Sequence, residues 1–296
     1  MKTGILETRT ASDHTSHDGF WGQLRIAITG GTSGLGLALV REFSARAARV
    51  AFLARHAEPV TKVERENTNT HGIVADVSDK DAIYPAALQI VGELGGLEVL
   101  INNASDLGPV PLALLADTNC EDLERAIATN ILGPFRLTKA LLGTLSASAR
   151  EGRAALVINI SSDAAVTPYP KWGAYAASKA ALRHLTEIWN QELSVEGIRL
   201  LSFDPGDMDT PMHALAVPNA DRTALKTADA AARELITAIE TQIRHDAVLG
   251  KRRLYLSLAN CCSLFSSCGS MSLRRIAMQS RHGQSSALSA ACHLSR

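Results

Sequence analysis

Residues 24–43 read LRIAITGGTSGLGLALVREF. The apolar run 24–29 predicts a buried strand, and the residues after the last glycine have the apolar spacing of an amphipathic helix. Between them, Gly30, Gly34 and Gly36 allow a close approach of the backbone to a ligand and of the helix to the strand. A strand, a glycine turn and a helix in this order present free N–H groups and a helix dipole to a pyrophosphate. The stretch therefore predicts a nucleotide-binding turn at the start of an α/β fold.

Five further apolar runs predict buried strands, at residues 49–54, 71–75, 97–101, 154–160 and 198–203. Helical patterns lie between these runs, and the longest cover residues 119–148 and 174–196. Because strands and helices alternate, the predicted fold is α/β, a single doubly wound, Rossmann-like parallel sheet with helices on both faces. Two later segments are less regular: we expect residues 212–226 to form a mobile loop and residues 247–256 a last short strand.

The composition is typical of a globular protein with a sizeable core, because 46% of its 296 residues are hydrophobic and 20% are charged. The formal net charge of +0 gives no electrostatic reason to expect binding to nucleic acid or to a membrane surface. The sequence contains neither the apolar core of a secretory signal nor an apolar run of membrane-spanning length. We therefore expect a cytoplasmic protein.

The pattern divides the chain into three predicted regions. Residues 1–23 are polar and predict a flexible leader, whereas residues 24–256 carry all the predicted strands and form one predicted domain. Residues 257–296 are rich in Ser, Cys and Arg and predict a disordered tail. Four of the five cysteines lie in that tail, but their spacing fits no standard zinc finger, so we expect no metal site.

Residues 161–179 carry the groups best suited to chemistry. Tyr175 and Lys179 are four residues apart and lie on one face of a predicted helix. An ammonium group beside a phenol favours the phenolate, so we expect Lys179 to lower the pKa of Tyr175. Tyr175 would then exchange a proton near neutral pH. Ser162 follows the preceding strand, and its hydroxyl is placed to hold the same substrate oxygen.

The end of the second predicted strand indicates which dinucleotide fits the glycine turn. An NAD-binding unit carries an Asp or Glu there, whose carboxylate binds the ribose 2′-hydroxyl. This chain has Ala54 followed by Arg55. Without the carboxylate a 2′-phosphate is not repelled, and a guanidinium can pair with it. We therefore expect NADP(H) to be favoured over NAD(H), although Arg55 also fits an ordinary solvated surface charge.

Together these motifs resemble the compact, one-domain branch of the short-chain dehydrogenase/reductase family, over residues 24–256. The resemblance implies a catalytic set of Asn130, Ser162, Tyr175 and Lys179, in which Asn130 anchors a water that relays protons through Lys179. It also implies that the cofactor is bound by Thr29, Gly30, Thr32, Ser33, Gly34, Leu35, Gly36, Arg55, Asp76, Val77, Asn102, Ala104, Tyr175, Lys179, Pro205, Gly206 and Thr210. The chain departs from the family where Ser105 and Ala164-Ala165 stand in place of usual glycines, which would narrow the nicotinamide pocket.

The predicted activity is NAD(P)-dependent oxidoreduction. A hydride passes between nicotinamide C4 and the carbon of a carbonyl compound or secondary alcohol, while Tyr175 acts as general acid or base. We expect the substrate pocket to be lined by Tyr169, Trp172, Met212, His213, Leu215 and Val217. These side chains indicate a partly apolar carbonyl compound, and ordinary packing explains them equally well.

Other functions share this fold, because fold does not fix function. A non-catalytic NADP-binding sensor or an inactive homologue has no need of all four catalytic residues, which this chain retains. A sugar-nucleotide epimerase or dehydratase needs a larger C-terminal domain than residues 251–296 provide. The resemblance implies a small-molecule substrate and a homodimer or homotetramer formed through the helices at 119–148 and 174–196.

Overall fold

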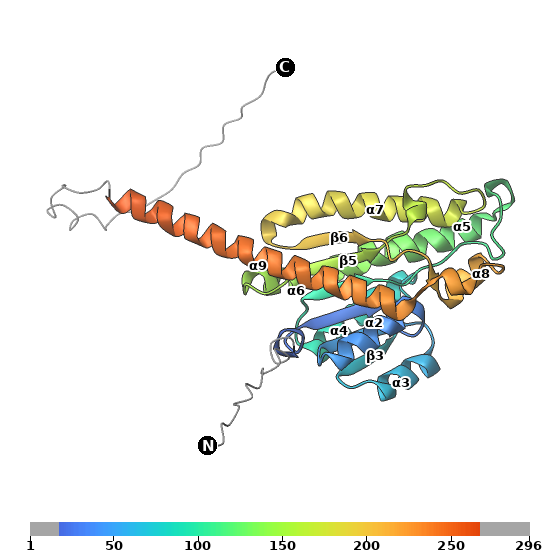
Figure 1. Ribbon diagram of the computed structural model, residues 1–296, viewed down its shortest axis with the longest axis horizontal. Helices are drawn as coiled ribbons and strands as arrows, with labels where there is room; N and C mark the ends of the chain where they lie inside the picture. Colours follow the sequence, from blue (N-terminus) through green and yellow to red (C-terminus); the bar gives the residue numbers. More distant parts are fainter. Residues whose placement is uncertain (1–17, 267–296) are drawn as a thin grey trace, which may run out of the picture. The chain divides into compact units, whose positions relative to one another are not determined.

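A six-stranded parallel sheet forms the centre of the structure (Figure 1). The computed structural model describes residues 18–266, with side chains for residues 19–248. The strand order is β3-β2-β1-β4-β5-β6, so the winding of the sheet reverses between β1 and β4. This order confirms the predicted doubly wound, Rossmann-like fold. Ligands of such sheets bind at the reversal, outside the carboxyl ends of the strands.

The strands of this sheet are β1 (Arg25–Thr29), β2 (Arg49–Ala54), β3 (Thr70–Val74), β4 (Val99–Asn102), β5 (Leu156–Ile160) and β6 (Arg199–Phe203). Two short strands pair in parallel with each other, β7 (Met208–Asp209) and β8 (Lys226–Thr227). The α-helices are α1 (Asp18–Trp21), α2 (Gly34–Ala45), α3 (Ala57–Glu66), α4 (Lys80–Leu94), α5 (Cys120–Ile127), α6 (Gly133–Arg150), α7 (Gly173–Leu193), α8 (Pro211–Ala216) and α9 (Ala228–Ser266). The remaining helical turns are η1 (Leu115–Asp117), η2 (Ala128–Leu132), η3 (Asp163–Ala165), η4 (Ser194–Glu196) and η5 (Arg222–Ala224).

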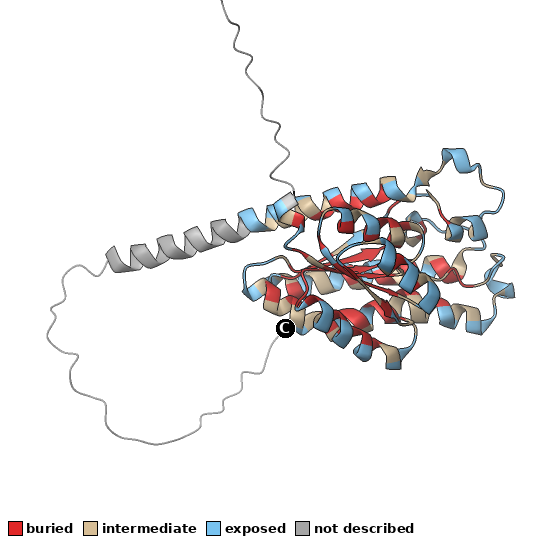
Figure 2. Ribbon diagram, turned by 90° about the horizontal axis from the view of Figure 1, so that it is seen from below, coloured by how far each residue is buried: buried red, intermediate tan, exposed pale blue. Residues whose placement is uncertain are grey.

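The sheet buries both of its faces. Side chains alternate along β1, so that Ile26 and Ile28 enter one apolar core and Ala27 enters another. Helix α2 and residues 231–239 of α9 complete the first core, whereas α4 and α6 contribute to the second. Figure 2 shows the buried residues, in red, gathered along the strands and the facing sides of the helices. Burial on both faces explains why the strands read as continuous apolar runs in the sequence.

The helical patterns at 119–148 and 174–196 are confirmed as α5–η2–α6 and α7–η4. The first of them contains a π-helical turn, η2, which has Asn130 at its centre. Helix α6 then begins at Gly133, where a Cβ atom would lie 2.8 Å from the carbonyl oxygen of Val77. This close approach requires glycine and brings the helix against the end of β3.

Two local predictions are wrong. Residues 247–256 are not a strand but part of α9. Most of the segment 212–226, expected to be a loop, is ordered as α8, η5 and the start of β8. Helix α8 begins with Pro211, and the Thr210 hydroxyl caps it by accepting a hydrogen bond from the His213 N–H at 3.2 Å.

The chain divides into two units, one ending at Arg244 and the other starting at His245. The sheet and the site described below belong to the first unit. Of the predicted tail, residues 257–266 are helical, within α9, and the rest lies outside the described residues, as does most of the predicted leader. The predicted domain limits therefore stay predictions.

Candidate active site

A cavity of about 790 Å³ lies at the carboxyl ends of the strands. Residues at or directly after the end of each of the six strands of the sheet contribute to its wall. Most of the residues predicted for catalysis and cofactor binding line it, namely Gly30, Thr32, Ser33, Gly34, Leu35, Arg55, Asp76, Val77, Ala104, Ser162, Tyr175, Lys179, Pro205, Gly206 and Thr210. One cavity therefore brings together groups that are 180 residues apart in the sequence, from Gly30 to Thr210.

The glycine turn is shaped for a diphosphate. Gly30 has a φ of +72°, and a Cβ atom there would lie 3.0 Å from the Cα atom of Ala104. A Cβ atom on Gly36 would lie 2.1 Å from the carbonyl oxygen of Gly30, so Gly36 supports the turn from behind the cavity wall. Ser33 is the N-cap of α2, its side chain does not cap the helix, and the first turn carries no acidic residue. The first N–H groups of α2 therefore remain available to an anion.

Thr29 and Asn102 also lie behind the cavity wall rather than in it. The Thr29 hydroxyl accepts hydrogen bonds from the N–H groups of Asn103, at 2.9 Å, and Ala104, at 3.0 Å. The buried amide of Asn102 donates to Asn159 Oδ1 at 2.8 Å. These bonds tie β1 to the end of β4 and β4 to β5. The direct cofactor contacts expected of Thr29 and Asn102 stay predictions.

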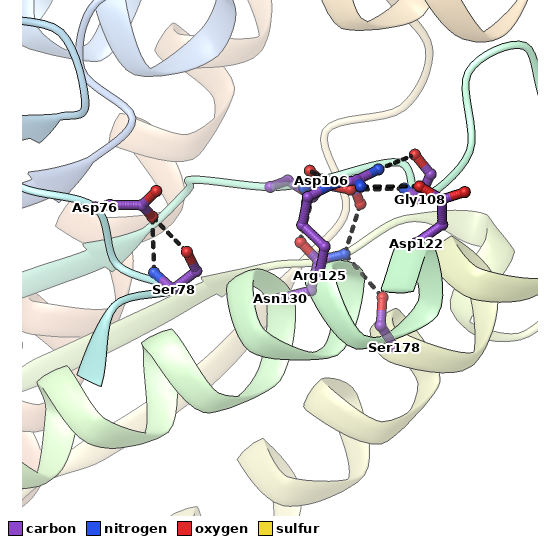
Figure 3. A network of polar contacts seen from close by, with 9 residues as sticks. Asp76, Ser78, Asp106, Gly108, Asp122, Arg125, Asn130 and Ser178 are labelled. Carbon is purple, nitrogen blue, oxygen red and sulfur yellow. Dashed lines mark hydrogen bonds and ion pairs between the residues drawn. The ribbon is translucent and has the colours of Figure 1, made fainter. Parts of the chain in front are cut away.

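Arg55, directly after β2, is the residue of the cavity wall that bears on the choice between NADP(H) and NAD(H). Arg55 is exposed and lines the cavity, and it forms no hydrogen bond or ion pair with any described residue. No carboxylate stands at the end of β2. Asp76 follows β3, and its Oδ1 atom accepts hydrogen bonds from the N–H, at 2.8 Å, and the hydroxyl, at 2.7 Å, of Ser78 (Figure 3). The Asp76 carboxylate is thus held at the cavity rim.

Ser162, Tyr175 and Lys179 meet at the other side of the cavity. Tyr175 is 9% exposed and Lys179 only 2%. The Lys179 Nζ atom lies 5.5 Å from the centroid of the Tyr175 ring and donates a hydrogen bond to the carbonyl oxygen of Ile160 at 2.8 Å. The hydroxyl of Ser162 acts on the Tyr175 phenol in the direction that lowers its pKa.

The expected pKa shift of Tyr175 is wrong in direction. Burial raises the pKa of Tyr175 to about 12, against the opposing effect of the Ser162 hydroxyl. Burial also lowers the pKa of Lys179 to about 8. The spacing of four residues correctly placed the two groups together, but it carried no information on how deeply α7 buries them.

Asp163 is a cavity residue that the sequence analysis missed. Its Oδ1 atom accepts the hydrogen bond of the Ser162 hydroxyl at 2.9 Å and that of the Ala164 N–H at 2.7 Å. Its Oδ2 atom accepts the hydrogen bond of the Tyr169 hydroxyl at 2.7 Å. The bond from Tyr169, followed by those from Ser162 and Ala164, holds the pKa of Asp163 below its usual value.

Asn130 lies beside the cavity but does not line it, and it is fully buried. Its Nδ2 atom donates to the Asp106 carbonyl and to the Ser178 hydroxyl, each at 2.8 Å. Its Oδ1 atom accepts from the Ser105 hydroxyl at 3.0 Å and from the Asp106 N–H at 2.8 Å. Arg125 joins the same network by donating to Asp106 Oδ2 at 3.1 Å (Figure 3). The amide is therefore directed inward, toward the segment after β4 and toward α7.

Most of the residues predicted to line a substrate pocket lie in the wall of the cavity. Tyr169, Trp172, Met212, His213 and Val217 line it, whereas Leu215 does not. Ser105, expected to narrow the nicotinamide pocket, lines the cavity, and the lining residues that sequence reasoning missed include Leu107, Thr129, Asp163, Asp204 and Asp207. The positions of the aspartates within four residues after β5 and β6 were the available signal, because parallel strands place their following residues at one edge.

Within residues 18–266, no helix combines the length and apolar character of a membrane span. The same described part of the chain contains no cluster of three or more His, Cys, Asp or Glu side chains suited to a metal ion. Of the cysteines, Cys120 is free and exposed.

Comparison with known proteins identifies the family of the chain. The family model described as short chain dehydrogenase matches residues 25–221. The chain is 32% identical over 194 residues to the 2-(R)-hydroxypropyl-CoM dehydrogenase of Xanthobacter autotrophicus, covering 64% of this chain and 76% of that protein. It is 33% identical over 187 residues to the serine 3-dehydrogenase of Agrobacterium fabrum, covering 62% of this chain and 72% of that protein. Across the curated relatives, the matched part spans from about a third to about three quarters of their length.

Solved structures show the same fold. The 3-ketoacyl-(acyl-carrier-protein) reductase from Brucella melitensis, complexed with NADH, superposes with a TM-score of 0.68 at 22% identity, covering 73% of this chain and 90% of that one. The NADPH-bound carbonyl reductase from chicken fatty liver gives a TM-score of 0.65 at 26% identity, covering 72% and 90%. With the family model, the sheet order and the cavity in agreement, the chain belongs to the short-chain dehydrogenase/reductase family, as an NAD(P)-dependent oxidoreductase.

Proposed function

We propose that this protein reduces a carbonyl compound to a secondary alcohol with NADPH, and that Tyr175 donates the proton. The observation that carries the proposal is the meeting of Ser162, Tyr175 and Lys179 in the cavity that begins at the glycine turn. When bound, the nicotinamide cofactor supplies the hydride. The wall of this cavity includes the N-terminus of α2 as well as the end of β5, so one cavity reaches from the glycine turn to the catalytic residues.

The protein groups have separable tasks in this mechanism. A phenol with a pKa of about 12 is protonated at neutral pH, so Tyr175 is ready to give its proton to a carbonyl oxygen. The protonated phenol is the form that acts as the acid in reduction. Lys179 is anchored at the Ile160 carbonyl, and its positive charge next to the Tyr175 ring stabilises the negative charge that develops on the phenol oxygen. Ser162 would bind the same substrate oxygen through its hydroxyl.

The preference for NADPH rests on Arg55. A 2′-phosphate can pair with its guanidinium, and no carboxylate at the end of β2 opposes the phosphate. Structural relatives hold NADH as well as NADPH, so the fold alone does not decide between them. We expect Arg55→Ala to weaken NADPH binding by roughly 10-fold or more and to leave NADH binding nearly unchanged. Titration of each cofactor measures this. Arg65→Ala, an exposed position on α3 outside the cavity wall, is the matched control.

Tyr175→Phe tests the catalytic assignment. It removes the proton donor and keeps the ring, so we expect turnover to fall by about 10²-fold or more while NADPH affinity stays near that of the wild type. Tyr84→Phe, on the exposed face of α4, is the control for replacing a tyrosine. Wild-type turnover in the Tyr175 variant would contradict the proposed proton transfer. Cofactor binding by the wild type without turnover of any carbonyl compound would instead support the sensor alternative.

The substrate and the assembly are part of the proposal. Two relatives are named for 2-(R)-hydroxypropyl-CoM and for serine, so a carbonyl screen should include small polar ketones besides apolar ones. A homodimer or homotetramer through α5, α6 and α7 is supported by apolar side chains that remain exposed there. Phe135 of α6 stacks on Trp189 of α7 at 5.1 Å and is still 38% exposed. Light scattering on the purified protein measures the number of subunits.

A further inference from the structure

The carboxylate of Asp163 is the nearest charged group to the hydroxyl that is to bind the reacting oxygen. It directly follows Ser162, opens η3, and lines the cavity. Its Oδ1 atom lies 2.9 Å from Ser162 Oγ, and its Oδ2 atom is held by the Tyr169 hydroxyl at 2.7 Å. Both oxygens of this exposed carboxylate are therefore hydrogen-bonded, and Oδ1 lies directly beside Ser162 Oγ.

This arrangement creates competition for one hydrogen atom. The Ser162 hydroxyl has a single hydrogen to donate, and in the structure that hydrogen goes to Asp163. A hydrogen bond to a carboxylate is stronger than one to a neutral carbonyl oxygen. A plain ketone would therefore bind with Tyr175 as its donor while Ser162 remains turned to Asp163. A substrate that offers Asp163 a better donor would release the Ser162 hydrogen.

The charges around the cavity indicate what kind of donor fits. Besides burial, the charges of Asp204, Asp163 and Asp207 raise the pKa of Tyr175, and all three residues line the cavity. Among the described residues that line the cavity, Lys179 and Arg55 are the basic side chains other than histidines. Arg55 belongs to the glycine-turn side, and Lys179 is already bonded to Ile160. A cation is thus favoured near Asp163, and an anionic substrate group is disfavoured.

The spacing indicates where that cation sits on the substrate. Ser162 Oγ and the carboxylate oxygen are separated by 2.9 Å, which is similar to the separation of two heteroatoms on neighbouring carbons. We propose that Asp163, held by Tyr169, is a specificity residue that selects carbonyl substrates with a protonated amino group on the carbon next to the reacting one. This inference rests on the proposed carbonyl reduction. Binding of the amino group to Asp163 would also free the Ser162 hydroxyl for the carbonyl oxygen.

The test compares three ketones of similar size with NADPH, below neutral pH: aminoacetone, hydroxyacetone and 2-butanone. We expect the wild type to prefer aminoacetone over 2-butanone in kcat/KM by about 10-fold or more, because a charge-assisted hydrogen bond is gained. Asp163→Asn should bring this ratio close to one, mainly through the KM for aminoacetone. Asp207→Asn is the matched control, because it removes another negative charge from the cavity wall and leaves the hydrogen bond between Ser162 and Asp163 in place. It should change the ratio by about 2-fold at most. Tyr169→Phe keeps the carboxylate and should keep most of the preference.

A binding measurement separates this inference from the proposed function. In the Tyr175→Phe variant with NADPH, we expect aminoacetone to raise the melting temperature more than 2-butanone does. The added Asp163→Asn change should abolish the difference. If Asp163→Asn retains the wild-type preference in both assays, or the wild type shows none, Asp163 does not select the substrate, whatever the activity. If the wild type reduces none of the ketones but binds aminoacetone selectively through Asp163, the assigned reaction fails and the specificity residue stands.

Discussion

The buried ammonium of Lys179 should make the stability of this protein rise with pH in a range where most proteins change little. Lys179 is 2% exposed, and burial lowers its pKa from 10.5 to about 8. In the unfolded chain the group keeps its ordinary pKa. A difference of this size corresponds to about 3 kcal/mol of destabilisation while the group is charged in the folded protein. Folding is therefore opposed below about pH 8, and the opposition is relieved as the pH rises toward the ordinary lysine value.

Lys179→Met removes the titrating group and keeps a side chain of similar length. Between about pH 7 and about pH 9.5 we expect the free energy of unfolding of the wild type to rise by about 2 kcal/mol relative to this variant. Urea unfolding without cofactor, at both pH values and on both proteins, measures the double difference. All other titrating groups are present in both proteins, so their effects cancel. Identical pH dependence in the two proteins would refute the assigned burial of a charged Lys179.

Two further substitutions test the parts of the fold that hold the site. Glu98 is fully buried and bonded to both Arg25 and Arg153, so Glu98→Gln should lower the free energy of unfolding by about 3–5 kcal/mol. A urea midpoint like that of the wild type would show that the two arginines are satisfied without the charge. Gly36→Ala places a Cβ atom 2.1 Å from the Gly30 carbonyl oxygen, so it should abolish NADPH binding even where circular dichroism shows a folded protein. Unchanged NADPH affinity by titration would contradict the described turn.

The central sheet could be predicted because its strands are buried on both faces. Such strands read as apolar runs, and the small or polar residues that follow them mark the cavity edge. The predicted strand at 247–256 failed for a related reason. An apolar run is compatible with a strand or a helix, and a helix that has started at Ala228 adds each further residue with one hydrogen bond. A strand needs a free sheet edge next to it, which sequence spacing does not report.

The sequence allowed a prediction of which residues lie together at the site, but not of how deeply they are buried. Motif spacing placed Ser162, Tyr175 and Lys179 together, because a helix brings residues four apart to one face. It did not predict that burial dominates both pKa values, since burial depends on distant parts of the chain. It also missed Asp163, whose role depends on hydrogen bonds from Ser162 and Tyr169 that no spacing rule describes.

The side-chain amide of Asn130 is fully occupied by hydrogen bonds to other residues. A side-chain amide offers two donor hydrogens and two acceptor positions, and the structure fills all four with groups of Asp106, Ser105 and Ser178. A relay water bound by this side chain would have to displace one of them. The amide instead joins the segment after β4 to Ser178, the residue before Lys179. A positional task, holding the part of α7 that carries Tyr175 and Lys179, is therefore what this side chain can perform without losing a bond.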